Sequence, residues 1–183
     1  MDPLALPDHA ILAAYAEAFD DGGHWAVVVD PSYKVLFVSE ELRKLYGPIP
    51  PIGSNYFSSE FLEYLYGSAF VRVEEGQSFT LAAPAMVYGD PEGRDGVKRV
   101  VDPQFHEILD QTEAKQPPPI QTSRFEVASL GITTAGTGLN LRIDGGAGTW
   151  IGTALIAKPA AGMAQLTAAH QLASGNASPQ GYP

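Results

Sequence analysis

Residues 25–47, WAVVVDPSYKVLFVSEELRKLYG, contain a complete strand, turn, strand and helix, and the rest of the chain is expected to pack around this unit. Trp25–Val29 is a short, apolar and mostly β-branched run, which predicts a strand buried on both faces near the middle of a sheet. In Asp30-Pro31-Ser32-Tyr33 the Asp can accept backbone hydrogen bonds and the Pro has its φ already set for a turn. The chain is therefore predicted to reverse there.

The second strand and its helix complete the unit. Alternation over residues 34–39 predicts a strand with Val35 and Phe37 on the same face. Ser39 is a suitable N-cap for a helix over residues 40–46. The unit holds no catalytic motif, so these residue types alone predict a sensor or binding domain.

The composition limits both the size of the fold and its partners. With 183 residues, the chain is long enough for one domain with a full core. A formal net charge of -10 leaves no basic stripe for phosphate groups, so neither nucleic acid nor an anionic membrane is an expected partner. No apolar run is long enough to cross a membrane and no signal peptide is visible, which predicts a cytoplasmic location. The absence of Cys excludes disulfides and thiolate metal sites.

Residues 1–23 are expected to form a short lead and one helix. Asp8 is the expected cap of this helix, which runs to about Phe19. Ile11, Tyr15 and Phe19 recur every four residues and form an apolar stripe. An amphipathic helix in this place packs either on the sheet or on a second subunit.

The segment after the central unit is predicted to be mostly helical. Residues 59–66, SEFLEYLY, are expected to form a short helix in a region crowded with aromatic residues, which are either ordinary core or the wall of a ligand cavity. Residues 68–96 show no clear pattern, because FVRVEE fits a strand by alternation and a helix by context. Asp102 and Pro103 predict a helix start, with Phe105 facing inward.

The C-terminal part is typical of a sheet. Residues 124–129 and 139–144 alternate between apolar and polar, and residues 149–158, TWIGTALIAK, form a strongly apolar strand. Leu139 and Leu141 are expected to face the core, and the polar residues between them are expected to face water. With the opening hairpin, these segments predict an α+β fold in which a five-stranded antiparallel sheet carries helices on one face.

The main domain is expected to span residues 24–159. A connector helix is predicted to follow over residues 160–173, where Met163 and Leu166 lie at coiled-coil spacing. Residues 174–183 are too polar and too rich in Gly and Pro to fold alone, so they are expected to form a disordered tail.

The order of two strands, several helices and three strands is that of a PAS domain, and VVVDPSYKVLFVSEELRKLYG resembles the opening of one. A narrower resemblance rests on AYAEAFDDGGHWAVVVDPSYKVLFVSEELRKLYG, PIGSNYF, the GRD and VDP elements near residues 93–103 and, above all, GTALIAKPAAGMAQL. These stretches are similar to the N-terminal regulatory region of certain bacterial class III adenylate/guanylate cyclases. The resemblance covers roughly residues 12–172.

The resemblance implies a PAS-like sensory domain that regulates a downstream cyclase. The apolar stripes on the predicted N- and C-terminal helices independently predict a homodimer joined through these helices. In that family, the segment after AKPAAGM continues through a helix into the cyclase catalytic domain, whose elements are not found in this chain. The chain itself is therefore not expected to be an enzyme. The alternative is a stand-alone small-molecule binding protein or a small enzyme that uses the same cavity.

The candidate ligand site is a cavity between the sheet and the intervening helices, because large apolar side chains from both halves of the chain converge there. Its expected lining residues are Phe37, Phe57, Phe61, Phe105, Phe125 and Leu141. The expected dimer contacts are Ile11, Tyr15, Phe19, Met163 and Leu166.

Neither a catalytic nor a metal site is expected, since the four histidines lie far apart and form no ligand motif. His106 lies on the helix where haem-binding PAS domains carry their axial histidine, so the resemblance allows haem. Helical register places His106 beside Asp102 and Asp110 on the polar side, which favours a solvated histidine paired with a carboxylate. The residues do not indicate which cofactor or ligand, if any, is bound.

Overall fold

The computed structural model describes residues 4–66, 71–72, 75–129 and 132–157, with the side chains of most of them. The connector helix and the tail predicted for residues 160–183 lie outside this part of the chain.

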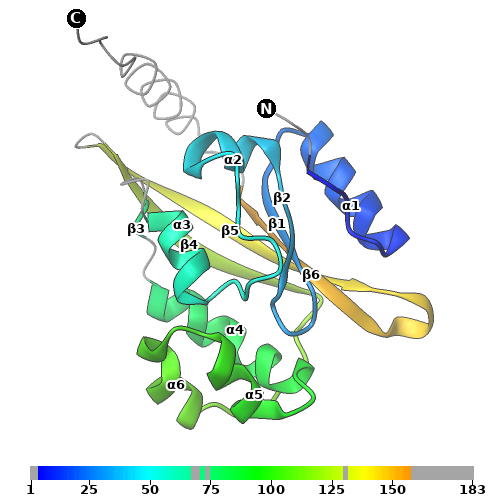
Figure 1. Cartoon of the computed structure of the whole chain (residues 1–183), viewed down its shortest axis with the longest axis vertical. Helices are drawn as coiled ribbons and strands as arrows, with labels where there is room; N and C mark the ends of the chain where they lie inside the picture. Colours follow the sequence, from blue (N-terminus) through cyan, green and yellow to red (C-terminus); the bar gives the residue numbers. More distant parts are fainter. Residues whose placement is uncertain (1–3, 67–70, 73–74, 130–131, 158–183) are drawn as a thin grey trace, which may run out of the picture.

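The described strands form one antiparallel sheet in the order β2-β1-β6-β5-β4-β3 (Figure 1). Their bounds are Trp25–Val29 (β1), Val35–Val38 (β2), Val71–Arg72 (β3), Ile120–Ser129 (β4), Ile132–Asp144 (β5) and Trp150–Ala157 (β6). Since β3 has only two residues, the other strands are the two-plus-three sheet predicted from the sequence.

One helix precedes β1, and the other described helices lie between β2 and β4 along the chain. The helices are α1 (Ala10–Asp21), α2 (Glu40–Tyr46), α3 (Ser59–Tyr66), α4 (Glu75–Gly89), α5 (Gly93–Val100) and α6 (His106–Asp110), with short 3-10 turns at Pro103–Phe105 and Gly146–Gly148. The stretch without a clear sequence pattern, residues 68–96, thus contains β3, α4 and the start of α5.

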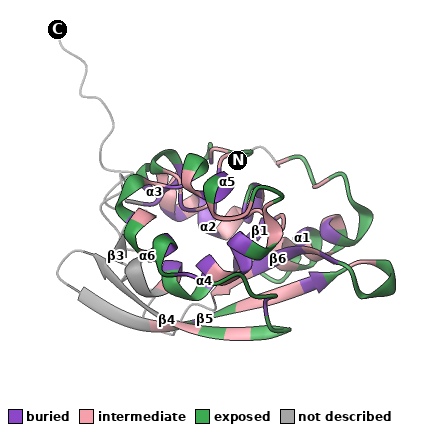
Figure 2. Cartoon of the chain, turned by 90° about the horizontal axis from the view of Figure 1, so that it is seen from below, coloured by how far each residue is buried: buried purple, intermediate pink, exposed green. Residues whose placement is uncertain are grey.

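Each face of the sheet has its own apolar cluster. On one face, Trp25, Val27 and Val29 of β1 pack with residues of α2 to α6, and we call this the helical cluster. On the other face, Val28 packs with α1, and we call this the α1 cluster. Figure 2 shows buried residues in the strands and on the adjacent helices, whereas the tip of the β5–β6 hairpin is exposed. The predicted α+β fold, an antiparallel sheet covered by helices, is confirmed.

Helix α1 packs on the sheet through Leu12 and Ala16, which are buried in the α1 cluster. The residue that caps it is His9 and not Asp8 as predicted, because His9 Nδ1 accepts the hydrogen bond from the backbone N–H of Ile11 at 3.3 Å. A histidine nitrogen can replace the usual oxygen acceptor at this position.

The prediction that Val35 and Phe37 share a face is wrong. A register shift between Val28 and Val29 pairs Val28 with Phe37 and Val29 with Val35, so β2 has one extra residue at this point. Such a bulge interrupts the alternation of side chains. Val35 consequently packs in the helical cluster and Phe37 in the α1 cluster.

Ser39 lies at the N-cap position of α2 but does not cap it with its side chain. Its Oγ instead accepts a hydrogen bond from the backbone N–H of Ala26 in β1, at 3.0 Å. Asp20 Oδ1, at the end of α1, accepts from the N–H of Glu40 at 2.6 Å. These bonds tie α2 to the central strand and to α1.

Residues 111–119, which we call the proline connector, are attached to the helices before they enter β4. The N–H of Lys115 donates to the carbonyl oxygen of Pro84 in α4 at 2.9 Å. Arg94 Nη2 in α5 donates to the carbonyl oxygen of Thr112 at 2.6 Å.

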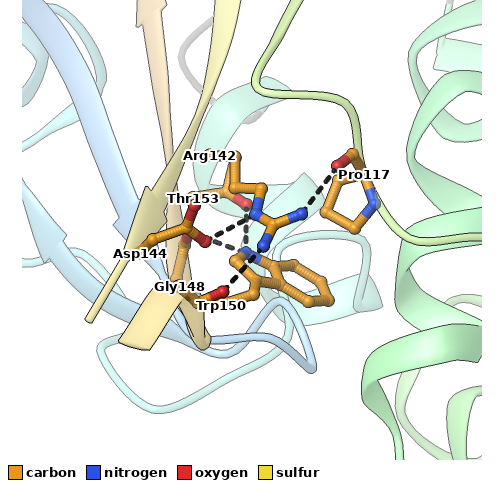
Figure 3. A network of polar contacts seen from close by, with 7 residues as sticks. Pro117, Arg142, Asp144, Gly148, Trp150 and Thr153 are labelled. Atoms are coloured by element: carbon orange, nitrogen blue, oxygen red, sulfur yellow. Dashed lines mark hydrogen bonds and ion pairs between the residues drawn. The ribbon is translucent and has the colours of Figure 1, made fainter. Parts of the chain in front are cut away.

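Arg142 of β5 joins the proline connector to the β5–β6 hairpin (Figure 3). Its guanidinium donates to Asp144 Oδ1 at 2.6 Å, to the carbonyl oxygen of Gly148 at 3.2 Å and to that of Pro117 at 3.3 Å. Only 12% of the side chain is exposed, so these bonds are largely shielded from water. One planar cation therefore holds three segments in place.

Replacing Arg142 should loosen this junction. We expect Arg142→Ala to lower the free energy of unfolding by about 2 kcal/mol, because three acceptors lose a charged donor. Arg142→Lys should restore only part of the loss, since a single ammonium cannot reach three separate acceptors. Urea denaturation measures both effects. Arg99→Ala is the matched control, because the Arg99–Glu92 pair is 57% and 65% exposed and should contribute little. An equal loss in Arg142→Ala and Arg99→Ala would contradict the assignment.

Asp30 closes the β1–β2 turn, where its Oδ1 accepts from the N–H groups of Ser32 at 2.8 Å and Lys34 at 2.9 Å. Burial raises the pKa of its carboxyl, and the two backbone hydrogen bonds oppose this rise. The folded state therefore keeps this proton to a higher pH than the unfolded chain. The stabilising contribution is complete below the ordinary pKa of Asp and is lost as the pH rises through the raised value.

Asp30→Asn retains the acceptor oxygen and removes the titration. We expect the variant to gain stability relative to wild type as the pH rises from about 4 to 7, as measured by urea denaturation at a series of pH values. Asp110→Asn is the control of opposite sign, because Lys98 lowers the pKa of the Asp110 carboxyl. That variant should lose stability relative to wild type as the pH rises from the lowered pKa of Asp110 to the ordinary pKa of Asp, and the difference should change little above about pH 5. A pH-independent difference for Asp30→Asn would show that the carboxyl is not perturbed.

Candidate functional site

A cavity of about 120 Å³ lies between the sheet and the helices, and we call it the tyrosine cavity because Tyr33, Tyr46 and Tyr56 line it. It is bordered by the face of the sheet that carries the helical cluster. A dry cavity of about 150 Å³ in another protein holds benzene, so this volume suits a small ring compound.

The floor of the tyrosine cavity is a row of paired residues across the sheet. Trp25 of β1 pairs with Ala157 of β6, Ala157 pairs with Gly138 of β5, and Gly138 pairs with Ser123 of β4. All four residues line the cavity. Three small residues beside one large indole leave space above the sheet that a row of larger side chains would fill.

The wall of the tyrosine cavity comes from the helices. Leu42 and Tyr46 lie four residues apart on α2, and Ser78 and Ala82 lie four residues apart on α4, so each pair presents one helix face to the cavity. Leu65 of α3 adds to this wall. Apolar surface therefore predominates, with a few hydroxyl and amide groups among it, as is typical of small-molecule sites.

The hydroxyl groups of the three tyrosines remain protonated at neutral pH. Burial raises the pKa of Tyr56 to about 12, and it raises the pKa values of Tyr33 and Tyr46 as well. The neighbouring hydroxyl of Thr153 in β6 opposes part of the rise in the pKa of Tyr33. The hydrogen bonds that join described residues include none from the hydroxyls of Tyr46 and Tyr56. The protonated hydroxyls of these two lining residues can therefore act as hydrogen-bond donors.

Asn140 of β5 also lines the tyrosine cavity, although the sequence predicted it to face water. Its neighbours Leu141 and Ile143 pack in the α1 cluster on the opposite face, and Leu139 is 41% exposed. The prediction was wrong because both faces of this sheet are covered, so that alternation does not reveal which face carries the cavity.

Three of the predicted lining residues lie in the helical cluster. Phe57 lines the tyrosine cavity, whereas Phe61 and Phe105 are buried in the cluster away from its lining. Phe57 contacts Phe105 with ring centroids 5.8 Å apart, and Phe79 stacks on Phe105 at 4.2 Å. Phe61 and Phe105 therefore lie in the packed core that supports the wall.

Two other predicted lining residues, Phe37 and Leu141, pack in the α1 cluster on the far face of the sheet and do not reach this cavity. Phe125 of β4 pairs with Gly136 of β5, and its side chain lies outside the described ones. Tyr33, Tyr46, Ser123 and Asn140 line the cavity but were not predicted to do so. Among them only the tyrosines show a signal in the sequence, as aromatic residues next to buried strand and helix positions.

The predicted dimer contacts of α1 lie at the edge of the α1 cluster. Ile11 is 37% exposed. Tyr15 and Phe19 are half-buried and contact each other with ring centroids 5.9 Å apart. Met163 and Leu166 lie outside the described residues.

His106 does not line the tyrosine cavity. It is half-buried at the start of α6, and its Nε2 lies 3.0 Å from the carbonyl oxygen of Lys98. Asp102 and Asp110 have lowered pKa values, caused first by Ser59 and Lys98 respectively, and His106 adds a smaller electrostatic contribution to both. Within the described residues there is neither a cluster of three metal-binding side chains nor a helix able to span a membrane.

Among solved structures, the chain is similar to PAS domains at low sequence identity. The chain is similar to the PAS domain from Bordetella pertussis BvgS, with a TM-score of 0.45, 15% identity, and coverage of 90% of this chain and 97% of that one. It is also similar to the PAS domain of a protein from Colwellia psychrerythraea, with a TM-score of 0.42, 15% identity, and coverage of 82% and 97%. No protein-family model and no curated protein matches the sequence.

Proposed function

We propose that this chain is a sensory and regulatory module. In this proposal the tyrosine cavity binds a small molecule, two copies of the chain form a homodimer, and the state of the cavity controls a class III nucleotide cyclase domain in the full-length protein. The module itself acts by binding and not by catalysis.

The observation that carries the proposal is the position of the cavity at the end of the last strand. Leu155, Ile156 and Ala157 of β6 all line the cavity. They directly precede the segment for which the sequence predicts a connector helix, residues 160–173. A ligand that moves this end of β6 acts on the chain just before that helix, so occupancy of the cavity is coupled to whatever follows it.

Apolar surface on the other face of the sheet supports the homodimer. Ile11 on α1 is 37% exposed, Leu139 on β5 is 41% exposed and Ile120 on β4 is 60% exposed. A second copy that covered these side chains would remove apolar area from water. The predicted stripe with Met163 and Leu166 would extend the same contact.

A side chain that fills the cavity should prevent a ligand from changing the activity of the cyclase domain. In the full-length protein we expect Gly138→Val to abolish any change in cyclic nucleotide formation on ligand addition, because the new side chain enters the cavity from β5. Gly146→Val is the matched control, since a Cβ at Gly146 meets no atom within 4 Å. The 183-residue chain alone should form no cyclic nucleotide from ATP or GTP with a divalent metal. A gene without a cyclase domain, or a Gly138→Val protein that still responds, would contradict the proposal.

The homodimer should depend on the C-terminal stripe. Leu166→Glu should weaken dimerisation at least tenfold, because a buried side chain of this size contributes on the order of 1.5 to 3 kcal/mol. Val100→Glu, which adds the same charge at a position 45% exposed on α5, is the control and should leave dimerisation unchanged. Sedimentation velocity at micromolar to hundred-micromolar concentrations decides the question. A wild-type chain that remains monomeric would exclude the homodimer.

A further inference from the structure

The residues that line the tyrosine cavity indicate which charge its ligand can carry. Its described lining residues are apolar or neutral and none is charged. Moving an ion into such a site without a counter-charge is costly, whereas an uncharged ring compound gains from the removal of apolar surface from water. The buried cation Arg43 is 1% exposed on α2, but it is not among the lining residues.

The tyrosine hydroxyls of the cavity indicate which hydrogen-bonding groups its ligand should have. Thr153 lies beside the hydroxyl of Tyr33, whereas the hydroxyls of Tyr46 and Tyr56 make no hydrogen bond among the described residues. The hydroxyls of Tyr46 and Tyr56 are not among the fully enclosed, unbonded polar atoms of the described residues, so they retain accessible surface. Two tyrosine donors that line one apolar cavity favour a ligand with an acceptor oxygen.

We propose that the tyrosine cavity selects uncharged, single-ring compounds that carry a hydrogen-bond-accepting oxygen, held by the hydroxyls of Tyr46 and Tyr56. This inference rests on the proposed function and specifies the chemical class of the ligand. Charged compounds of the same shape are excluded because no described lining residue neutralises them. A cavity of about 120 Å³ suits a ligand of about one ring with a small substituent.

Four probes of similar shape separate these requirements. Acetophenone is neutral with an acceptor oxygen, ethylbenzene lacks the oxygen, benzoate is an anion and 1-phenylethylammonium is a cation. We expect acetophenone to bind with a Kd between about 10 µM and 1 mM, as is usual for ligands of this size. Ethylbenzene should bind about tenfold more weakly, and the two ions should not bind at 1 mM. Isothermal titration calorimetry and ligand-observed NMR measure these affinities.

Variants assign the effect to the tyrosine hydroxyls. The double variant Tyr46→Phe, Tyr56→Phe should bind acetophenone no more tightly than ethylbenzene, and its affinity for ethylbenzene should remain that of wild type. Retained ethylbenzene binding shows that the cavity is intact. Tyr15→Phe removes a hydroxyl from the opposite face of the sheet and should change neither affinity. Gly138→Val should abolish binding of both compounds, with circular dichroism used to verify its fold.

Several results would overturn the inference. Equal affinity for acetophenone and ethylbenzene in the wild type, or an unchanged preference in the double tyrosine variant, would exclude the hydroxyls as the selecting groups. Tighter binding of benzoate or 1-phenylethylammonium would show that the ligand is charged.

If no probe binds, native mass spectrometry separates the two failures. A small molecule retained by wild type and absent from Gly138→Val would show that the cavity binds a ligand of another class. If no probe binds and wild type retains no small molecule, ligand binding would have to be removed from the proposed function as well.

Discussion

The structure depends on the burial of β1 on all sides. Every residue of Trp25–Val29 is buried, and the strand pairs with β2 along one edge and with β6 along the other. Its side chains alternate between the helical cluster and the α1 cluster. Such a strand has one register in which every backbone polar group is hydrogen-bonded and every apolar side chain is buried. The two layers of helices are positioned relative to this strand.

The tyrosine cavity follows from an imbalance in side-chain size on one of these faces. Protein interiors are usually close-packed, so an opening requires small residues where neighbouring positions hold large ones. Ala157, Gly138 and Ser123 form such a row beside Trp25, and Tyr46 and Tyr56 stand opposite as part of the wall. The same aromatic residues that enclose the space also supply its neutral hydroxyl groups. Shape and hydrogen-bonding chemistry therefore come from one set of side chains.

The segments around the cavity are joined by polar contacts that lie outside it. Arg142 connects β5 to the proline connector and to the hairpin before β6. Ser39 and Asp20 connect α2, which carries Tyr46, to β1 and α1. The floor and the wall are thus each anchored to the sheet. In the proposed sensory role, the end of β6 is the part of the floor nearest to the segment that follows the domain.

The sequence by itself determined the elements whose signals are local. The opening hairpin, α2, α3 and β6 were predicted within a few residues, because apolar runs, turn residues and helix stops act over short distances. Tertiary structure decided the bulge that separates Val35 from Phe37, the bond from Ala26 to Ser39 Oγ and the inward placement of Asn140. Each of these depends on a neighbouring strand or on which face the helices cover. Alternation in a strand defines two faces but does not identify them, and when both faces are buried only the packing of distant segments shows which one encloses the site.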